Sequence, residues 1–203
     1  MTKELTPWQS FKNEYDLDDQ KLGLFIKFID FLDKENQKTN LTGLAETADM
    51  INYHLKDSLS LMKFEDLSEK TIVDIGSGAG FPGLPLAIAT NCNITLLEIR
   101  EKRIKFLEES KDILGLNNAT VDSRDWLTFI RAKRDPVDYY IARASLQPED
   151  LIKVFSRDPD STIVYWASEI WEPSDKIKDY IVKDFPYNVG ERERRLVFLK
   201  KRK

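Results

Sequence analysis

The chain has 203 residues, of which 41% are hydrophobic and 33% charged, and its formal net charge is −4. This length suits one domain with an additional segment, and the apolar fraction is sufficient for a core. One histidine and one cysteine argue against a His/Cys metal site, an internal disulfide and a Cys/His catalytic pair. The negative charge provides no overall attraction for nucleic acid, so any such contact needs a local basic patch.

The sequence also lacks the usual targeting and membrane signals. No apolar run reaches the roughly 20 residues that a membrane-spanning helix needs, and residues 1–7 lack the apolar core of a signal peptide. The single Cys92 fits a reducing compartment. We therefore expect a cytoplasmic monomer with no membrane partner and no bound metal.

The N-terminal third is expected to be helical after a loosely ordered start at residues 1–19. Apolar residues then recur at steps of three and four, which is typical of an amphipathic helix, and the polar segment 34–40 is expected to end it. A second helical face follows between residues 50 and 62. The two faces consist of Leu22, Phe25, Ile29 and Leu32, and of Met50, Ile51, Leu55, Leu59 and Met62. We predict a helical cap over residues 1–66.

From residue 67 onward, strand patterns alternate with helix patterns. Residues 71–75 and 94–98 are short, apolar segments of the kind found in buried strands. A glycine-rich turn and a helix follow the first of them, and a helix ending near Gly115 follows the second. The later elements are expected as a strand near 120, a helix at 125–131, a strand at 137–142, a helix at 148–155, a strand at 161–167, a helix at 174–182 and a strand at 195–199. This alternation predicts an α/β fold over 67–203, with a mostly parallel sheet covered on both faces and an antiparallel last strand at or near an edge.

The most specific feature is a glycine loop after the first of these strands, with the pattern Asp74-x-Gly76-x-Gly78-x-Gly80. Glycines have no side chain and permit positive φ, so a ligand can lie against main-chain atoms. In open α/β sheets, ligands bind beyond the carboxyl ends of the strands, where this loop is expected.

Three nucleotide-containing ligands compete for such a loop. A phosphate-binding loop needs a Lys-Ser/Thr pair after the glycines, and none is present. A dinucleotide fingerprint beginning at Gly76 would place its third glycine at Phe81, so that match fails. S-adenosylmethionine carries an amino acid and a ribose but no phosphate. It suits this loop because Asp74 can orient the loop or meet the ligand's ammonium.

Glu98 ends the second strand, and its carboxylate has two interpretations. It can accept hydrogen bonds from both ribose hydroxyls, as an acid after the second strand does in dinucleotide folds. Alternatively, it opens a charged helix in which Arg100, Glu101, Lys102 and Arg103 follow. The agreement of strand, loop and spacing favours the ribose role.

Further motifs accompany the loop, and among them Gly80-Phe81-Pro82-Gly83 is far more specific than the glycines alone. The others are Asn40-Leu41-Thr42, His54-x-x-Asp57-Ser58, Lys102-Arg103-x-x-Phe106-Leu107 and, more weakly, Arg124, Arg143-Ala144 and the segment 190–199. In these motifs the sequence resembles the bacterial small-subunit rRNA guanine-N7 methyltransferases, also called glucose-inhibited division protein B. The resemblance implies a Rossmann-like, class I S-adenosylmethionine-dependent methyltransferase domain with an N-terminal helical extension.

The same resemblance implies methyl transfer to a guanine N7 in the 530 loop of 16S rRNA, with S-adenosylhomocysteine as the product. Guanine N7 is a bare lone pair, so no catalytic base is required and the protein's task is orientation. We take Arg143 as the candidate for positioning the substrate and Arg124 as the candidate for supporting the cofactor or the RNA. The expected cofactor-binding residues are Asp74, Gly76, Ser77, Gly78, Gly80, Phe81, Glu98, Arg124 and Arg143.

Contact with 16S rRNA or the small ribosomal subunit needs cations for phosphate. The candidates are Lys102, Arg103, Arg194, Arg195, Lys200 and Lys201. Three aromatic residues could stack on bases or lie in the core: Trp126, Tyr140 and Trp166. His54 adjoins an apolar helix face, so a buried structural role is the first expectation, and a role in shaping the cap over a ligand is the alternative.

The resemblance weakens after residue 120. Members of the family usually have Arg-x-Glu after the third strand, where this chain has Arg124-Asp125-Trp126. They usually have Leu-Lys-Gly after the fifth strand, where Trp166-Ala167-Ser168 lacks the lysine. Two alternatives to rRNA methylation therefore stay open: a non-catalytic protein that binds the cofactor, and a methyltransferase that acts on a small molecule.

Overall fold

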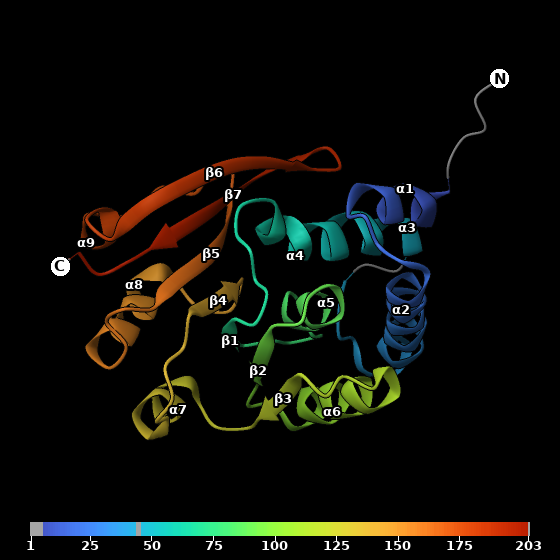
Figure 1. Ribbon diagram of the computed structural model, residues 1–203, viewed down its shortest axis with the longest axis horizontal. Helices are drawn as coiled ribbons and strands as arrows, with labels where there is room; N and C mark the ends of the chain where they lie inside the picture. Colours follow the sequence, from blue (N-terminus) through green and yellow to red (C-terminus); the bar gives the residue numbers. More distant parts are fainter. Residues whose placement is uncertain (1–5, 44–45, 203) are drawn as a thin grey trace.

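The structure, a computed structural model, describes residues 6–43 and 46–202. Within these ranges, one seven-stranded sheet has the order β3-β2-β1-β4-β5-β7-β6 (Figure 1). Strands β1 to β5 pair in parallel, and β7 runs antiparallel to both of its neighbours. The strands are β1 (Thr71–Ile75), β2 (Asn93–Leu97), β3 (Ala119–Asp122), β4 (Tyr139–Arg143), β5 (Thr162–Ser168), β6 (Ile181–Val189) and β7 (Arg192–Leu199). The predicted α/β fold and the antiparallel last strand are confirmed.

Helices cover both faces of the sheet, as predicted. Successive strand side chains point to opposite faces, so Ile72 joins one buried cluster and Val73 the other. The first cluster includes side chains of the cap, of α5 (Gly83–Ala89) and of α6 (Glu101–Leu114). The second includes side chains of α7 (Trp126–Ala132), α8 (Pro148–Leu151) and the following 3₁₀ turn η3 (Ile152–Ser156).

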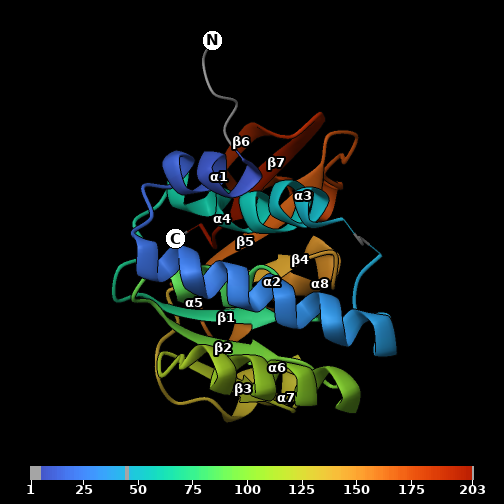
Figure 2. The same cartoon turned by 90° about the vertical axis from the view of Figure 1, so that its right-hand side faces the viewer.

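The N-terminal helices form the cap that lies over the first cluster. Its long helix α2 packs against α5 and α6, and in Figure 2 it runs in front of the sheet, below α1 and α3 and above α6. The expected second helical face is a nearly continuous helix over residues 47–63 that contains one π-helical turn. The cap elements are α1 (Pro7–Glu14), α2 (Asp19–Thr39), α3 (Thr47–Met50), the π-turn η1 (Ile51–Lys56), α4 (Asp57–Leu59) and the 3₁₀ turn η2 (Ser60–Lys63).

The expectation of a loosely ordered start is wrong for the described residues from 6 onward, because α1 forms there. The Thr6 hydroxyl accepts from the Gln9 N–H and the Gln9 side chain accepts from the Thr6 N–H, so the helix begins with a capping box. Pro7 occupies the first helical position, where its missing N–H costs little. Phe11 is fully buried and holds this short helix against the cap.

The polar segment 34–40 does not break the first long helix, contrary to expectation. Helix α2 continues to Thr39, and Asn40 ends it in the left-handed conformation with φ of 50°. Polar residues are compatible with an exposed helical face, and the Lys38–Glu35 pair stabilises this one at i,i+3 spacing.

The expected helix at 174–182 is largely wrong as well. Only α9 (Asp175–Lys178) is helical, and residues 181–189 form β6, a strand that the sequence did not predict. β6 is an edge strand with a mostly half-exposed surface, so it lacks the apolar alternation that identifies buried strands. Pro186 is compatible with this place because edge strands tolerate a missing N–H.

Candidate functional site

The carboxyl ends of β1, β2 and β4 meet at one edge of the sheet, beneath the cap. The order reverses here, since β2 and β4 lie on opposite sides of β1, and such a switch point is where ligands bind in open α/β sheets. A cavity of about 420 Å³ opens at this place, a size typical of small-ligand sites. It is lined by Leu41, Thr42 and His54 from the cap, by Ile75 to Ala79 and Phe81, by Leu97 to Arg100 and Arg103, by Arg124 to Trp126, and by Arg143 to Leu146.

The glycine loop forms one wall of the cavity. Gly76 has a φ of 74°, and a Cβ added there would lie 2.6 Å from the Ser145 Cβ, so the loop after β4 requires glycine at this position. Gly78 has a φ of 60° and no heavy atom nearer than 3.7 Å to an added Cβ, so it is needed mainly for its left-handed backbone. The N–H groups of Gly76 and Ser77 both donate to the Leu97 carbonyl at 2.9 Å. The loop is thereby tied to the end of β2.

Glu98 lies beside the glycine loop in the cavity wall and is 5% exposed. Its Oε1 accepts hydrogen bonds from the N–H groups of Ile99 and Arg100, and its Oε2 accepts one from the Gly78 N–H at 3.1 Å. Arg103 Nη1 lies 3.6 Å from the same Oε2. A carboxylate has about four lone-pair sites, so Glu98 has room for one further hydroxyl, whereas a second would have to displace Gly78.

Two of the predicted cofactor-binding residues, Asp74 and Gly80, do not line the cavity. Asp74 is fully buried, and its Oδ2 accepts from the Gly83 N–H at 3.1 Å, so it orients the loop and the start of α5. Burial raises the pKa of Asp74 to about 7, against the opposing effect of hydrogen bonds to Ser77 and Gly83.

His54 belongs to the cavity wall and is also structural. Its ring stacks on Phe81 with centroids 4.5 Å apart. Arg143 Nη2 lies 2.9 Å from His54 Nδ1, and Thr42 Oγ1 lies 2.7 Å from Nε2. Because arginine can only donate, Nδ1 accepts and the proton resides on Nε2, which donates to Thr42. Burial and the Arg143 charge lower the pKa of His54 to about 3, so the ring is neutral.

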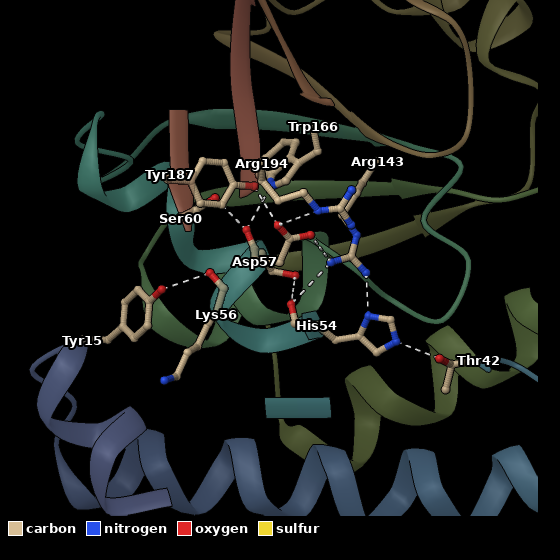
Figure 3. A network of polar contacts seen from close by, with 11 residues as sticks. Tyr15, Thr42, His54, Lys56, Asp57, Ser60, Arg143, Trp166, Tyr187 and Arg194 are labelled. Carbon is tan, nitrogen blue, oxygen red and sulfur yellow. Dashed lines mark hydrogen bonds and ion pairs between the residues drawn. The ribbon is translucent and has the colours of Figure 1, made fainter. Parts of the chain in front are cut away.

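Asp57 is the centre of the polar network behind Arg143 (Figure 3). This carboxylate is 1% exposed, and its Oδ2 accepts from Arg143 Nη1 at 2.9 Å. Its Oδ1 accepts from the Tyr187 hydroxyl at 2.6 Å and lies 3.9 Å from Arg194 Nε. The indole N–H of Trp166 donates to the Asp57 carbonyl at 2.8 Å. One residue of the cap thus joins β4, β5, β6 and β7.

Sequence reasoning named Asp57 only as a partner of His54 in shaping the cap, and it assigned no role to Tyr187. The signal for Asp57 was present, because His54-x-x-Asp57-Ser58 was one of the motifs. The π-helical turn η1 precedes it directly, and such turns are frequent at functional sites. Tyr187 lies in the strand that the sequence did not predict, so nothing pointed to it.

The other predicted residues lie in different places. Arg124 lines the cavity at its rim and is held by an ion pair with Asp122. Trp126 also lines the cavity, whereas Tyr140 and Trp166 are buried in the core.

The predicted RNA-binding cations do not form one group. Arg103 lines the cavity, and Lys102 is exposed beside it at the start of α6. Arg195 is held by an ion pair with Asp184 and donates to the Trp171 carbonyl at 2.7 Å. Lys200 and Lys201 follow the end of β7, where Leu199 pairs with Ile163 near the start of β5. They therefore lie at the edge of the sheet opposite the cavity, while Arg194 lies on the cavity side.

Neither a metal-binding cluster nor a membrane-spanning helix occurs in the part of the chain that the structure describes. In residues 6–43 and 46–202, no group of three or more His, Cys, Asp or Glu side chains is placed to hold a metal ion. Over the same residues, no helix combines the length and apolar character needed to span a bilayer.

The geometry fits a ligand with a ribose. Gly78 leaves the wall bare, and a buried carboxylate at the end of β2 suits hydroxyl groups. Together with the strand order, these features define a class I S-adenosylmethionine-dependent methyltransferase fold. A solved S-adenosylmethionine-dependent methyltransferase from Aquifex aeolicus is similar to this chain, with a TM-score of 0.57 at 15% identity, over 79% of this chain and 97% of that one.

The sequence comparisons give the family. The family described as GidB, rRNA small subunit methyltransferase G, matches residues 21–165, and this chain belongs to it. It is 35% identical over 148 residues to the ribosomal RNA small subunit methyltransferase G of Aster yellows witches'-broom phytoplasma, covering 72% of this chain and 70% of the relative. It is 43% identical over 96 residues to that of Clostridium botulinum strain Alaska E43, covering 46% of this chain and 40% of the relative. The matched part is thus less than half of the second relative's length.

Proposed function

We propose that this chain transfers a methyl group from S-adenosylmethionine to guanine N7 in the 530 loop of 16S rRNA, acting in the cytoplasm as a monomer. The observation that carries the proposal is the cavity in which the bare main chain of Gly78 faces the buried carboxylate of Glu98. The family membership, resting on residues 21–165, supports small-subunit rRNA as the substrate.

The chain's own residues divide the work of binding and orientation. The loop from Gly76 to Ala79 would hold the cofactor against the main chain, and Glu98 would accept a ribose hydroxyl. When bound, S-adenosylmethionine supplies a methyl group activated by the positive charge on its sulfur. Phe81, His54 and Arg143 form a stacked wall within the same cavity. Such flat groups are suited to holding a base and presenting one of its edges.

The protonation chemistry of the wall favours guanine N7 over a nucleophile that must lose a proton. The groups of the described wall that could accept a proton are His54, Glu98 and Asp125. His54 is neutral with both ring nitrogens bonded, Glu98 accepts three N–H groups, and Asp125 accepts from the Thr128 N–H at the start of α7. A bare lone pair such as N7 needs no base, so its methylation depends on placement alone.

The test is methyl transfer to a defined substrate. The protein is incubated with labelled S-adenosylmethionine and small ribosomal subunits from cells that lack this protein, and the label is mapped. We expect the label at one guanine N7 in the 530 loop. Saturable binding without transfer would overturn the proposal in favour of a non-catalytic protein. If the subunits stay unlabelled and only small molecules of an added cell extract accept the label, a methyltransferase that acts on a small molecule is favoured.

A further inference from the structure

A second hollow lies where β1, β4 and β5 begin, at the opposite end of the strands from the cavity. It has a volume of about 620 Å³ and is distinct from the cofactor cavity, since the two share no lining residue. Six basic residues line it: Lys70, Arg131, Lys133, Arg134, Arg157 and Lys200. Against them stand three carboxylates, on a chain whose net charge is −4. Positive charge is therefore concentrated here.

Two of the three carboxylates are held by neighbours within the hollow. Asp158 pairs with Lys133 at 2.6 Å and accepts from the Tyr140 hydroxyl at 2.8 Å. Asp138 accepts from the Thr71 N–H at 2.9 Å and lies 3.8 Å from Lys70. The third, Asp160, is exposed and also has an interaction of its own.

Four of the cations remain available to a ligand. Arg131, Arg134, Arg157 and Lys200 are exposed, and none of them has an ion pair with another residue of the described ranges. Guanidinium groups suit phosphate because their planar forks can bind two oxygens.

Helix α7 connects this hollow with the cofactor cavity. Arg124 and Trp126 at its beginning line the cavity, whereas Ile130 and Arg131 at its end line the hollow. A helix of seven residues is about 10 Å long, and α7 occupies a corner of the molecule in Figure 1. A folded RNA whose base enters the cavity could therefore reach the hollow along this helix.

We propose that the hollow lined by Arg131, Arg134, Arg157 and Lys200 is a second RNA-contact surface, which binds backbone phosphates of the RNA whose base occupies the cavity. The inference rests on the proposed function. It also assigns Lys200, one of the predicted RNA-binding residues, to a surface away from the methyl donor. Phosphate contacts of this kind position a nucleic acid without reading its sequence.

The test compares two double variants that lose the same charge. In Arg131→Gln/Arg157→Gln the hollow loses two cations, and in Lys34→Gln/Lys38→Gln the exposed end of α2 loses two. Affinity for naked 16S rRNA and for small subunits is measured over a range of salt concentrations. Affinity for S-adenosylhomocysteine reports on the cavity.

We expect the arginine variant to bind RNA on the order of tenfold more weakly, with a salt slope reduced by about one for each phosphate that the variant no longer binds. Its affinity for S-adenosylhomocysteine should be unchanged, and the lysine variant should behave as the unaltered protein. Equal RNA affinity and salt slope in the two variants would overturn the second surface. A different outcome is that the unaltered protein binds RNA but transfers no methyl group, while the arginine variant binds RNA more weakly. In that case the proposed function fails and the surface stands.

Discussion

At the scale of single residues, the site depends on one arginine held from two sides. Arg143 is largely buried, and burial lowers its pKa while the neighbouring Asp57 carboxylate opposes that effect. Asp57 binds one side of the guanidinium and His54 the other. A guanidinium fixed by two hydrogen-bonded partners keeps one orientation, which is what a positioning residue needs.

The tautomer of His54 can be tested directly, because the chain has a single histidine. The pKa of His54 is lowered from its ordinary value of 6.5 to about 3. Between these two pH values the imidazole takes up a proton in the unfolded chain but not in the folded one. This group therefore contributes stability that is present above pH 6.5 and is lost as the pH falls from there toward 3. We expect nitrogen NMR of the imidazole to show an unchanging neutral Nε2–H form from pH 5 to 8. A titration near pH 6.5 in the folded protein would contradict the contact with Arg143.

Removal of the Asp57 carboxylate should destabilise the fold. Asp57→Ala leaves the Arg143 charge buried without its partner, and breaking a buried pair in this way costs about 3–5 kcal/mol. Urea unfolding measures the change. As a control, Asp30→Ala removes an exposed carboxylate of α2 and should alter the free energy of unfolding by about 0.5 kcal/mol or less. A decrease below about 1 kcal/mol for Asp57→Ala would show that Arg143 finds another partner.

At the scale of elements, two glycine variants distinguish the effect of backbone strain from the effect of ligand contact. Gly78→Val puts a branched side chain at a φ of 60° beside the cavity, whereas Gly115→Val puts one at a φ of 66° at the end of α6 with nothing within 4 Å. Both variants should be destabilised by about 1–2 kcal/mol because of the left-handed backbone. Only Gly78→Val should also weaken S-adenosylhomocysteine binding, by tenfold or more in calorimetry. Equal binding in the two variants would argue against the loop as the cofactor wall.

The elements that the sequence predicted well are those with local signals. The strand at 71–75, the loop and Glu98 could be found because a buried strand, a glycine turn and the next strand end lie within 30 residues. The missed strand β6 has no such signal, because its residues are half exposed and its place depends on pairing with β7. Helix α1 was missed because its order comes from a capping box and one buried phenylalanine rather than from a long apolar pattern.

The candidate site divides in the same way. Gly78 and Glu98 were each predicted to bind the cofactor, and a hydrogen bond joins them. The contact between Asp57 and Tyr187 links residues 130 positions apart, so only the folded sheet brings them together. Likewise, the basic segment after Arg192 reads as one group in sequence. The antiparallel direction of β7 sends its beginning and its end to opposite edges of the sheet.

At the scale of the whole molecule, the cap and the sheet share one core. A single buried cluster contains Phe25 and Leu32 of α2, Leu84 of α5 and strand residues such as Ile94. The cofactor cavity is likewise lined from both sides, by Thr42 and His54 of the cap and by the loops of the sheet. We therefore propose that the cap over 1–66 and the methyltransferase domain over 67–203 differ in topology but unfold together.

That proposal predicts one cooperative unfolding transition. Far-UV circular dichroism and tryptophan fluorescence should give coincident urea curves, because neither part can lose its share of the common core alone. S-adenosylhomocysteine at about 100 times its Kd should raise the free energy of unfolding by about 2.7 kcal/mol and shift the whole transition. Two transitions, with the ligand moving only one of them, would mean that the cap unfolds separately. The wall formed by His54 and Phe81 would then be assembled only when the cap closes, and cofactor affinity would depend on that closure.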